Sequence, residues 1–480
     1  MGARLERRSR AEQLQRQFVY LHMEQSIYIT KFGLVNQIKG IKFGLANQMF
    51  INKPAFTLFM NTDLIKQVIL EQNERKLPKN LVIRDIFGRL KSYFSYPQII
   101  VISGVRRCGK STLLLQMKSL YDGYYVNFDD ERFVGFDVQD FTKLNELLIE
   151  IYGEKNTYYF DEIQNILGWE RFVRRLFDSN KKVFVSGSNA TMLSKELGTH
   201  LTGRNIPITV FPFSFNEYLT YKGDSFDYNS LTSEKSALIK RNFNHYLVLG
   251  GFPEYLFSED DEYLKAMFQN ILYRDIIARY SIKDEKAIKE IIYYAVSNIG
   301  KEISFNSLKK LANLSSATSV RQYFEFFDNC YLAFLIQRFD KSLSKQIYFN
   351  KKIYFIDPAM ARILGFRMTE DYGRCLENIA FLHLKRMGRE IFFHKGNHEC
   401  DFILREGIKI TQAIQVTKEI EKQGRQRERE IAGLMDAMTS YKLKSGLILT
   451  FDQEDEILIK DKKILIRPLW KWLLTDQNIS

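Results

Sequence analysis

One nine-residue run carries two glycines, a lysine and two hydroxyl groups at spacings that suit a phosphate chain: Gly104-Val105-Arg106-Arg107-Cys108-Gly109-Lys110-Ser111-Thr112. It fits the pattern GxxxxGK followed by Ser or Thr at every position. Glycines let the backbone fold around phosphates with its N–H groups pointing inward, and a following helix presents its positive end to them. Lys110 would reach the β- and γ-phosphates, and the Ser111 hydroxyl would coordinate Mg²⁺. All nine residues are therefore predicted to contact a nucleotide.

A pair of carboxylates, Asp161 and Glu162, follows the apolar segment Tyr158–Phe160 directly. Asp161 would hold Mg²⁺, and Glu162 would orient and deprotonate an attacking water. A second acid beside the magnesium ligand favours hydrolysis over phosphoryl transfer to a bound metabolite. The alternative is an Asp-Glu pair that only complements the positive end of a helix. With a phosphate loop upstream, the sequence favours a catalytic role for Glu162 together with Lys110.

Three further side chains are candidates for contacting the γ-phosphate. Ser188 and Asn189 follow the strand-like run Val183–Val185, and either side chain would bond the γ-phosphate or the attacking water; the alternative is a Ser/Asn helix cap. Arg204 follows Gly203 and would act as a γ-phosphate sensor or as a finger on a neighbouring subunit; the alternative is a surface arginine. A finger role would require a homo-oligomer.

Short apolar runs that alternate with helical patterns surround these residues. Such alternation predicts βαβ units and a parallel sheet. Ligands of such sheets bind at the carboxyl ends of the strands, where the glycine-rich run and the two carboxylates lie. The predicted strands are Gln98–Ser103, Gly123–Phe128, Thr157–Phe160, Lys182–Val185 and Asn205–Val210, and the predicted helices are Ser111–Leu120, Thr142–Tyr152 and Trp169–Ser179.

Helical patterns flank the predicted sheet on both sides. Asp63–Asn73 and Leu81–Phe94 each read as an amphipathic helix before the first strand. Residues 224–285, after the last strand, are mostly helical in pattern, with one break at Gly250–Pro253. The sequence therefore predicts a helical segment on the carboxyl-terminal side of the sheet.

The composition is that of an ordinary globular protein, with 45% hydrophobic and 26% charged residues among 480. This excludes a wholly disordered, collagen-like or coiled-coil chain. The sequence contains no uninterrupted apolar run of about 18 residues, so no membrane partner is expected. Four cysteines without a CxxC pair fit a reducing, cytoplasmic compartment. A formal charge of +13 favours acidic partners, above all nucleic acid or nucleotides.

Together with the glycine-rich run, several short motifs resemble those of prokaryotic AAA-superfamily ATPases that carry a C-terminal domain of unknown function. The resemblance covers about residues 60–475 and implies ATP binding and Mg²⁺-dependent hydrolysis. It also implies a helical lid, residues 224–285, that closes on the nucleotide and in which Arg274 or Arg279 would supply a sensing charge. The motifs are Phe160–Gln164, Ser186–Asn189, Gly203–Arg204, Pro212–Tyr218, Gly250–Glu254 and Tyr273–Ile276.

The first 59 residues lie outside this resemblance. They are rich in arginine and contain a short repeat, Lys31–Gln37 and Lys42–Gln48. Two short copies are too few for a repeat architecture, which needs three or more longer units. We expect a basic, poorly structured extension; an arm that touches nucleic acid is the alternative.

Residues 286–365 resemble a winged helix, because Ser304–Ala312 and Ser316–Tyr331 are spaced as helix, turn and second helix. Strand-like pieces follow near Tyr348 and Tyr354. A helix that reads DNA exposes several basic or amide side chains, whereas the second helix here is rich in aromatic residues that look like core. Binding of DNA and binding of a protein through this part both stay open.

Residues 366–480 resemble the restriction-endonuclease-like fold. An active nuclease of that type carries Asp on one strand and Glu-x-Lys on the next, to hold Mg²⁺ and to support a hydroxide nucleophile. Asp401 is present here, but Gln415 and Thr417 take the places of the Glu and the Lys. Because a neutral Gln binds Mg²⁺ weakly, the resemblance implies an inactive relative.

These predictions combine into an ATP-driven switch that hydrolyses ATP with Mg²⁺ and acts on or near DNA. One alternative is a regulatory or scaffolding NTPase whose C-terminal half binds a protein. The other is an ATP-controlled, metal-dependent nuclease in which Glu377 and Glu399 would supply metal ligands. The expected fold class is α/β, in five parts: a basic extension (1–59), a P-loop core with a parallel sheet (60–223), a helical lid (224–285), a winged helix (286–365) and a mixed α/β nuclease-like domain (366–480).

Overall fold

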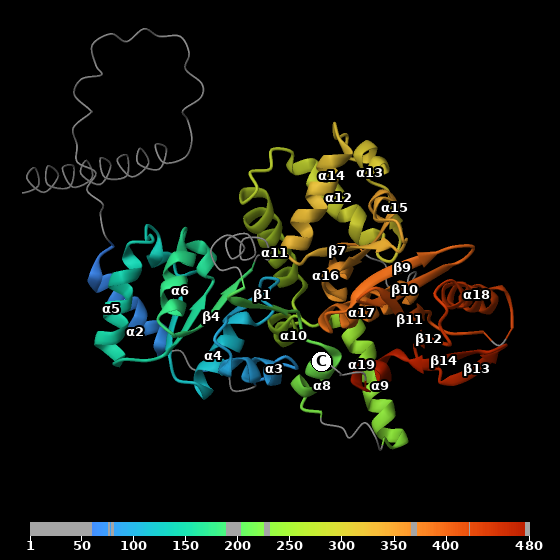
Figure 1. Cartoon of the computed structure of the whole chain (residues 1–480), viewed down its shortest axis with the longest axis horizontal. Coiled ribbons are helices and arrows are strands. Elements are labelled where there is room, and N and C mark those ends of the chain that lie inside the picture. The colour runs from blue at the N-terminus through green and yellow to red at the C-terminus, as the bar shows by residue number, and fades with distance from the viewer. Residues whose placement is uncertain are drawn as a thin grey trace, which may run out of the picture. The chain divides into compact units, whose positions relative to one another are not determined.

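Two sheets organise the computed structural model, which describes residues 60–74, 77, 81–188, 203–224, 231–365, 372–421 and 423–475 (Figure 1). All of these residues belong to one unit of the chain, Phe59–Ser480. The predicted basic extension, residues 1–59, lies outside the described residues.

The first sheet is parallel throughout, in the order β2-β3-β4-β1-β5. All six residues of β1 are buried, as expected for a central strand covered on both faces. The strand pairing confirms the predicted parallel sheet and the α/β fold class. The strands are β1 (Ile99–Gly104), β2 (Tyr124–Asn127), β3 (Thr157–Asp161), β4 (Lys182–Gly187) and β5 (Asn205–Val210).

Helices cover both faces of this sheet. Alternate residues of each strand point to opposite faces, and in β1 they pack against different helices. Ile100 and Ile102 belong to the same hydrophobic cluster as the apolar residues of α4, whereas Ile99 and Val101 cluster with those of α2, α5 and α6. The helices of this part are α2 (Thr62–Asn73), α3 (Phe87–Ser92), α4 (Lys110–Leu120), α5 (Asp140–Tyr152), α6 (Trp169–Asp178) and α8 (Phe215–Tyr221), with 3-10 turns at Tyr93–Ser95, Glu131–Phe133 and Ile163–Asn165.

The predicted helix Leu81–Phe94 is wrong over its first half. Only Phe87–Ser92 is α-helical, and Leu81–Arg84 has no regular structure. The Val82 carbonyl accepts a hydrogen bond from the side-chain amide of Gln116, and the Arg84 guanidinium binds two backbone carbonyls elsewhere in the core. These tertiary bonds override the helical pattern.

A helical segment follows the first sheet, as predicted, and its break falls at Gly250–Pro253. Gly250 has φ +63°, and a Cβ at Gly251 would lie 2.3 Å from the Phe213 carbonyl oxygen, so the turn requires both glycines. The Asp357 carboxylate accepts the Gly251 N–H at 2.7 Å and fixes the turn to the C-terminal half. The helices are α9 (Ser233–Leu249), α10 (Pro253–Ser258), α11 (Asp261–Asn270) and the π-helical η4 (Ile271–Ala278).

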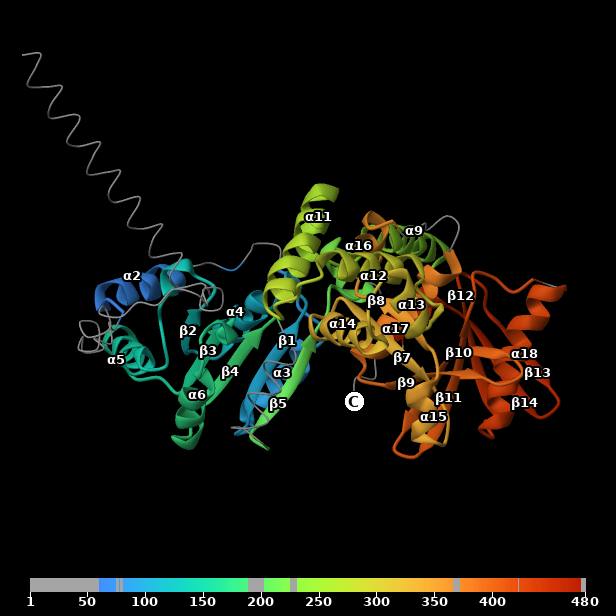
Figure 2. The same cartoon turned by 90° about the horizontal axis from the view of Figure 1, so that it is seen from above.

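The second sheet has nine strands in the order β13-β14-β12-β11-β10-β9-β7-β8-β6. Figure 2 labels its strands from β7 to β14. Strands of the predicted winged-helix and nuclease-like parts share this sheet, because β7 pairs in parallel with β9, with Gln337 beside Phe392. Its strands are β6 (Glu302–Ile303), β7 (Ala333–Arg338), β8 (Lys351–Phe355), β9 (Glu390–Lys395), β10 (Glu399–Glu406), β11 (Lys409–Val416), β12 (Ser445–Thr450), β13 (Asp455–Ile459) and β14 (Lys462–Pro468).

The strand predicted near Tyr348 is wrong, because Tyr348 ends helix α15. The Lys351 ammonium donates to the carbonyls of Gln346 and Ile347 at 2.6 and 3.0 Å and closes this helix. The strand near Tyr354 is confirmed as β8.

No helix among the described residues is long and apolar enough to span a membrane. The remaining helices are α12 (Glu285–Ser297), α13 (Phe305–Leu311), α14 (Ala317–Asn329), α15 (Leu343–Tyr348), α16 (Pro358–Ile363), α17 (Tyr372–Arg386), α18 (Arg425–Ser440) and α19 (Leu469–Thr475).

Candidate nucleotide-binding site

The glycine-rich run forms the turn between the end of β1 and the start of α4, as the sequence predicts. A Cβ at Gly104 would lie 2.1 Å from the Val210 carbonyl oxygen of β5, so a larger residue would push the sheet apart. Gly109 has φ +98° and directly precedes α4. The positive end of α4 therefore faces the space that the turn encloses.

Lys110 is buried at the start of α4 with its charge directed into this turn. Its ammonium donates to the carbonyl oxygens of Gly104 and Val105 at 3.2 Å and lies 3.4 Å from the Glu162 carboxylate. Burial disfavours the ammonium, but the carboxylates of Glu162 and Asp161 outweigh it and raise the pKa of Lys110. Lys110 is therefore charged and placed to meet an anion.

Asp161 ends β3 within a set of hydroxyl groups. The Tyr125 hydroxyl donates to its carboxylate at 2.9 Å, and the hydroxyls of Ser186 and Ser111 bond the same carboxylate. Burial and the neighbouring Glu162 raise the pKa of Asp161. The Ser111 hydroxyl and the Asp161 carboxylate are the hard oxygen ligands that Mg²⁺ prefers, so these residues fit that ion.

Glu162 follows in a left-handed conformation with φ +50°, which turns its side chain toward Lys110. Its N–H donates to the Ser186 hydroxyl at 3.1 Å, and the Gln164 amide donates to its carboxylate at 2.6 Å. Burial would raise the pKa of Glu162, but the attraction of Lys110 and the Gln164 hydrogen bond outweigh burial and lower it. Glu162 is therefore an ionised carboxylate, able to accept a proton.

A cavity of about 1110 Å³ opens beside these groups. It is lined by the glycine-rich run, by Asn127, Asp129 and Glu162, and by residues of the helical segment that include Pro253 and Glu254. The volume exceeds what a phosphate chain alone requires and lies slightly above the usual range for small-molecule sites, about 300–1,000 Å³.

The two arginines of the glycine-rich run bind the helical segment. Arg106 forms a two-pronged ion pair with Asp275 of η4 at 2.9 and 3.1 Å, and Arg107 lies 3.1 Å from Glu254 of α10. Across the cavity, Arg274 lies 2.6 Å from Asp129. The loop predicted to hold the nucleotide is thus tied directly to the predicted lid.

Of the two predicted sensing residues, Arg274 bonds a residue of the cavity wall, whereas Arg279 lies 3.7 Å from the buried Asp275.

The other predicted γ-phosphate contacts are not assembled in the same way. Arg204 precedes β5, whose first residue, Asn205, pairs with Ile99 at the amino end of β1, and it lies 3.6 Å from Asp178. It is therefore at the opposite end of β1 from the glycine-rich run of its own chain. Asn189 lies outside the described residues. Its neighbour Ser188 is buried, and no described group bonds its hydroxyl.

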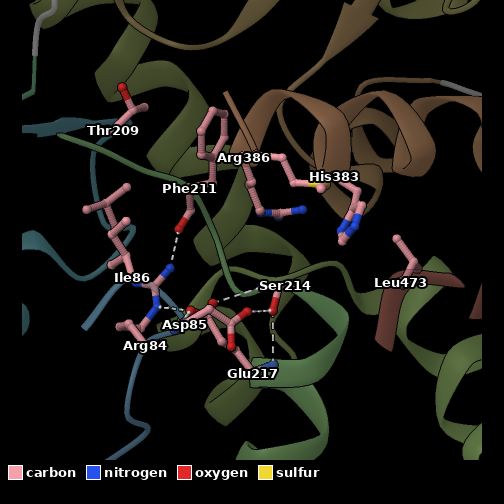
Figure 3. A pocket seen from close by; sticks show the side chains of 12 residues that line it. Arg84, Asp85, Ile86, Thr209, Phe211, Ser214, Glu217, His383, Arg386 and Leu473 are labelled. Atoms are coloured by element: carbon pink, nitrogen blue, oxygen red, sulfur yellow. Dashed lines mark hydrogen bonds and ion pairs between the residues drawn. The ribbon is translucent and has the colours of Figure 1, made fainter. Parts of the chain in front are cut away.

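Sequence reasoning missed Arg84, whose side chain bonds the backbone of the glycine-rich run. Its guanidinium donates to the Cys108 carbonyl at 2.8 Å. It also donates to the Phe211 carbonyl at 2.6 Å and pairs with Glu217 at 2.9 Å (Figure 3). Figure 3 also shows Arg386 and His383 of α17 across a small cavity of about 60 Å³. The one local signal was the Ser214–Glu217 capping box at the start of α8, which shows where the helix begins but not what Glu217 binds.

A second charged cluster lies in the second sheet, around the buried Lys352 of β8 and carboxylates from the predicted nuclease-like residues 366–480. The Lys352 ammonium lies 2.8 Å from Asp401, 2.8 Å from Glu399 and 3.1 Å from Glu377. Gln415 accepts the Asp401 N–H at 3.2 Å. Among the described residues no group of three or more His, Cys, Asp or Glu side chains is arranged to hold a metal ion. Lys352 thus supplies the positive charge at the centre of these carboxylates.

Comparison with known proteins finds two family models that match parts of this chain. Residues 96–219 match the model of an AAA domain, and residues 240–370 match a domain of unknown function, DUF8612. The uncharacterized protein MJ1544 of Methanocaldococcus jannaschii is 35% identical over 86% of this chain and 95% of its own length. An uncharacterized protein of Haemophilus influenzae is 30% identical over 67% of this chain and 83% of its own length. A Walker-type ATPase of Pyrococcus abyssi has 17% identity and a TM-score of 0.41 over 61% of this chain and 98% of its own.

Proposed function

We infer the function of this protein from its family: the chain belongs to the prokaryotic proteins in which an AAA domain precedes a C-terminal domain of unknown function. We propose that it binds ATP with Mg²⁺ and hydrolyses it as a nucleotide-driven switch. The observation that carries this proposal is the meeting of Lys110, Ser111, Asp161 and Glu162 at the carboxyl edge of the parallel sheet.

Each residue of this group has a defined role in the proposal. The backbone N–H groups of the glycine-rich run and the Lys110 ammonium bind the phosphates. Ser111 and Asp161 hold Mg²⁺, which when bound neutralises charge on the β- and γ-phosphates. Glu162 orients the attacking water and accepts its proton; its lowered pKa supports this role, because the carboxylate stays ionised at neutral pH.

We further propose that nucleotide binding moves the lid, residues 224–285. A phosphate chain beside Arg106 and Arg107 would compete with Asp275 and Glu254 for these side chains. Arg274 then supplies the sensing charge from η4. Arg204 acts only on a neighbouring copy in a homo-oligomer, because it lies far from the glycine-rich run of its own chain.

We propose a cytoplasmic location, because the four cysteines are free thiols.

We propose duplex DNA as the partner of the C-terminal half. The net charge of +13 favours DNA, and Arg321 and Gln322 of α14 are exposed in the part proposed as a winged helix, residues 286–365. A protein partner is the second candidate, favoured by the exposed apolar side chains of α15, such as Leu343 and Tyr348. Residues 366–480 are proposed as a nuclease-like domain that does not cleave.

Steady-state ATP hydrolysis by the full chain with Mg²⁺ tests the proposal. We expect slow turnover that Glu162→Gln lowers about 10²- to 10⁴-fold, the usual contribution of a general base, while the variant still binds ATP. Lys110→Ala, the control for binding, should lose ATP affinity. Stimulation by duplex DNA supports DNA as the partner, and a rate that ignores DNA favours a protein. Equal turnover of wild type and Glu162→Gln contradicts the role of Glu162.

A further inference from the structure

The cavity beside the glycine-rich run extends along α4 to a buried glutamine. Gln116 lies six residues after Lys110, about 9 Å further along the helix axis at 1.5 Å per residue. Its side chain lines the cavity and is 3% exposed. This end of the cavity is therefore displaced from the glycine-rich run by about two helical turns.

The hydrogen bonding of Gln116 leaves one acceptor free. Its amide nitrogen donates to the Val82 carbonyl oxygen at 3.0 Å. Because a carbonyl can only accept, the nitrogen must face Val82, and the orientation of the amide is fixed. No described group donates to the Gln116 Oε1 atom, although that atom is buried. A buried acceptor without a donor is unfavourable, so this atom is suited to receive a donor from a ligand.

The wall around Gln116 suits a flat, mostly apolar ring. The Val82 carbonyl bonds Gln116, and the apolar and aromatic residues that line the same cavity include Leu81, Val82, Leu113, Tyr221, Pro253 and Phe257. Phe257 of α10 is 85% exposed, so a ring lying against it would remove apolar surface from water. A purine base has this shape, with a few polar atoms on its edge.

We propose that the Gln116 Oε1 atom accepts a hydrogen bond from the exocyclic amino group of adenine, and that this contact selects ATP over GTP. The inference rests on the proposed function, because the phosphates at Lys110 direct the base along α4. Adenine carries an amino donor where guanine carries a carbonyl acceptor. Guanine would place two acceptors face to face, and a site built to accept a hydrogen bond rejects a ligand that lacks the donor.

Calorimetric titration of the full chain with three nucleotides in Mg²⁺ tests this contact. The nucleotides are ATP, GTP and purine riboside 5′-triphosphate, which lacks the amino group. For wild type we expect ATP to bind about tenfold more tightly than the purine analogue, as one hydrogen bond allows, and about 10- to 100-fold more tightly than GTP. Gln116→Leu should lower ATP affinity to that of the analogue and leave the affinity for the analogue within about twofold.

A matched control is Gln67→Leu, which changes an exposed glutamine of α2 that bonds Glu71, and it should keep the wild-type preference. If wild type binds ATP and the purine analogue equally, the inference is overturned while nucleotide binding stands. If wild type binds none of the three, the inference falls together with the proposed function. If Gln116→Leu does not fold, as judged by circular dichroism, the comparison of nucleotides on wild type still decides.

Discussion

At the scale of single residues, the site depends on opposite charges held close together, the Lys110 ammonium and the carboxylates of Asp161 and Glu162. Lys110 and Asp161 are buried and Glu162 is partly buried. The carboxylates beside Lys110 raise its pKa, Lys110 lowers the pKa of Glu162, and burial raises the pKa of Asp161. Arg84 also lines the cavity, and its guanidinium joins the Cys108 carbonyl to the buried Glu217 carboxylate. Such a pair fixes geometry, although it adds little net stability over a well-packed apolar pair.

The first prediction concerns this support. Arg84→Met should lower the free energy of unfolding by about 3–5 kcal/mol, because it leaves the Glu217 carboxylate buried without its cation. It should also weaken ATP binding, because the Cys108 carbonyl loses its donor. Urea denaturation and ATP titration measure the two effects.

The matched variant is the double substitution Arg84→Met with Glu217→Gln. It removes both charges and should recover part of the lost stability, since no unpaired charge remains. A double variant that is as unstable as the sum of the two single variants would show that Arg84 and Glu217 do not act as a pair.

At the scale of elements, the junction between α9 and α10 joins the helical segment proposed as a lid to the C-terminal half. Asp357 begins α16 by accepting the N–H groups of Ala359 and Met360 at 2.9 and 3.1 Å, and it also accepts the Gly251 N–H. A Cβ at Gly250 would lie 2.3 Å from this carboxylate. The glycine break in this helical segment is therefore shaped by a carboxylate more than one hundred residues away in sequence.

The second prediction follows from the burial of Asp357, which raises the pKa of its carboxyl to about 6 against the lowering effect of the three N–H groups. The unfolded chain has an ordinary Asp pKa of about 3.9, so the folded state holds this proton more tightly. The contribution to stability is present below pH 4 and is lost as the pH rises through about 6. The shift of about 2 units corresponds to about 3 kcal/mol.

Asp357→Asn tests this dependence, because asparagine keeps an acceptor oxygen and does not titrate. The difference in free energy of unfolding between wild type and variant, from urea denaturation at several pH values, should move in favour of the variant between pH 4 and pH 6.5. A difference that is constant over this range would contradict the raised pKa.

At the scale of the whole molecule, the C-terminal half contacts the end of β1. The Tyr331 hydroxyl donates to the Ser103 hydroxyl at 2.6 Å, immediately before the glycine-rich run. Arg386 of α17 donates to the carbonyls of Pro212 and Phe213 at 3.2 and 3.3 Å. A movement at the phosphate-binding turn therefore has a direct route to the second sheet, which is the physical basis of the proposed switch.

The third prediction concerns the nuclease-like part. Lys352 occupies the space among Glu377, Glu399 and Asp401 that a catalytic cation would need. The full chain with Mg²⁺ and ATP should therefore leave supercoiled plasmid DNA intact, as followed by gel electrophoresis. Mg²⁺-dependent nicking that Asp401→Ala abolishes would contradict this prediction and establish the nuclease alternative.

The sequence by itself determined the phosphate-binding turn and the sheet that carries it. The GxxxxGK pattern and the β-branched runs are local signals, because a turn around phosphate needs glycines at fixed spacing and a buried strand needs apolar side chains on both faces. The strands β1 to β5 and the positions of Lys110 and Asp161 therefore agree with the predictions made from their own segments. The helix predicted at Leu81–Phe94 failed where tertiary hydrogen bonds replaced helical ones.

Only the tertiary structure decided which distant segments complete each cluster. Arg84 pairs with Glu217 and Lys352 pairs with Asp401, each across 49 residues or more of sequence. Gln116 bonds the Val82 carbonyl, which belongs to a different segment of the chain. No local periodicity encodes such meetings, because a lysine or a glutamine inside an element looks the same whether it faces solvent or a buried carboxylate. Their partners are set by the packing of whole elements, and the chemistry of the sites depends on that packing.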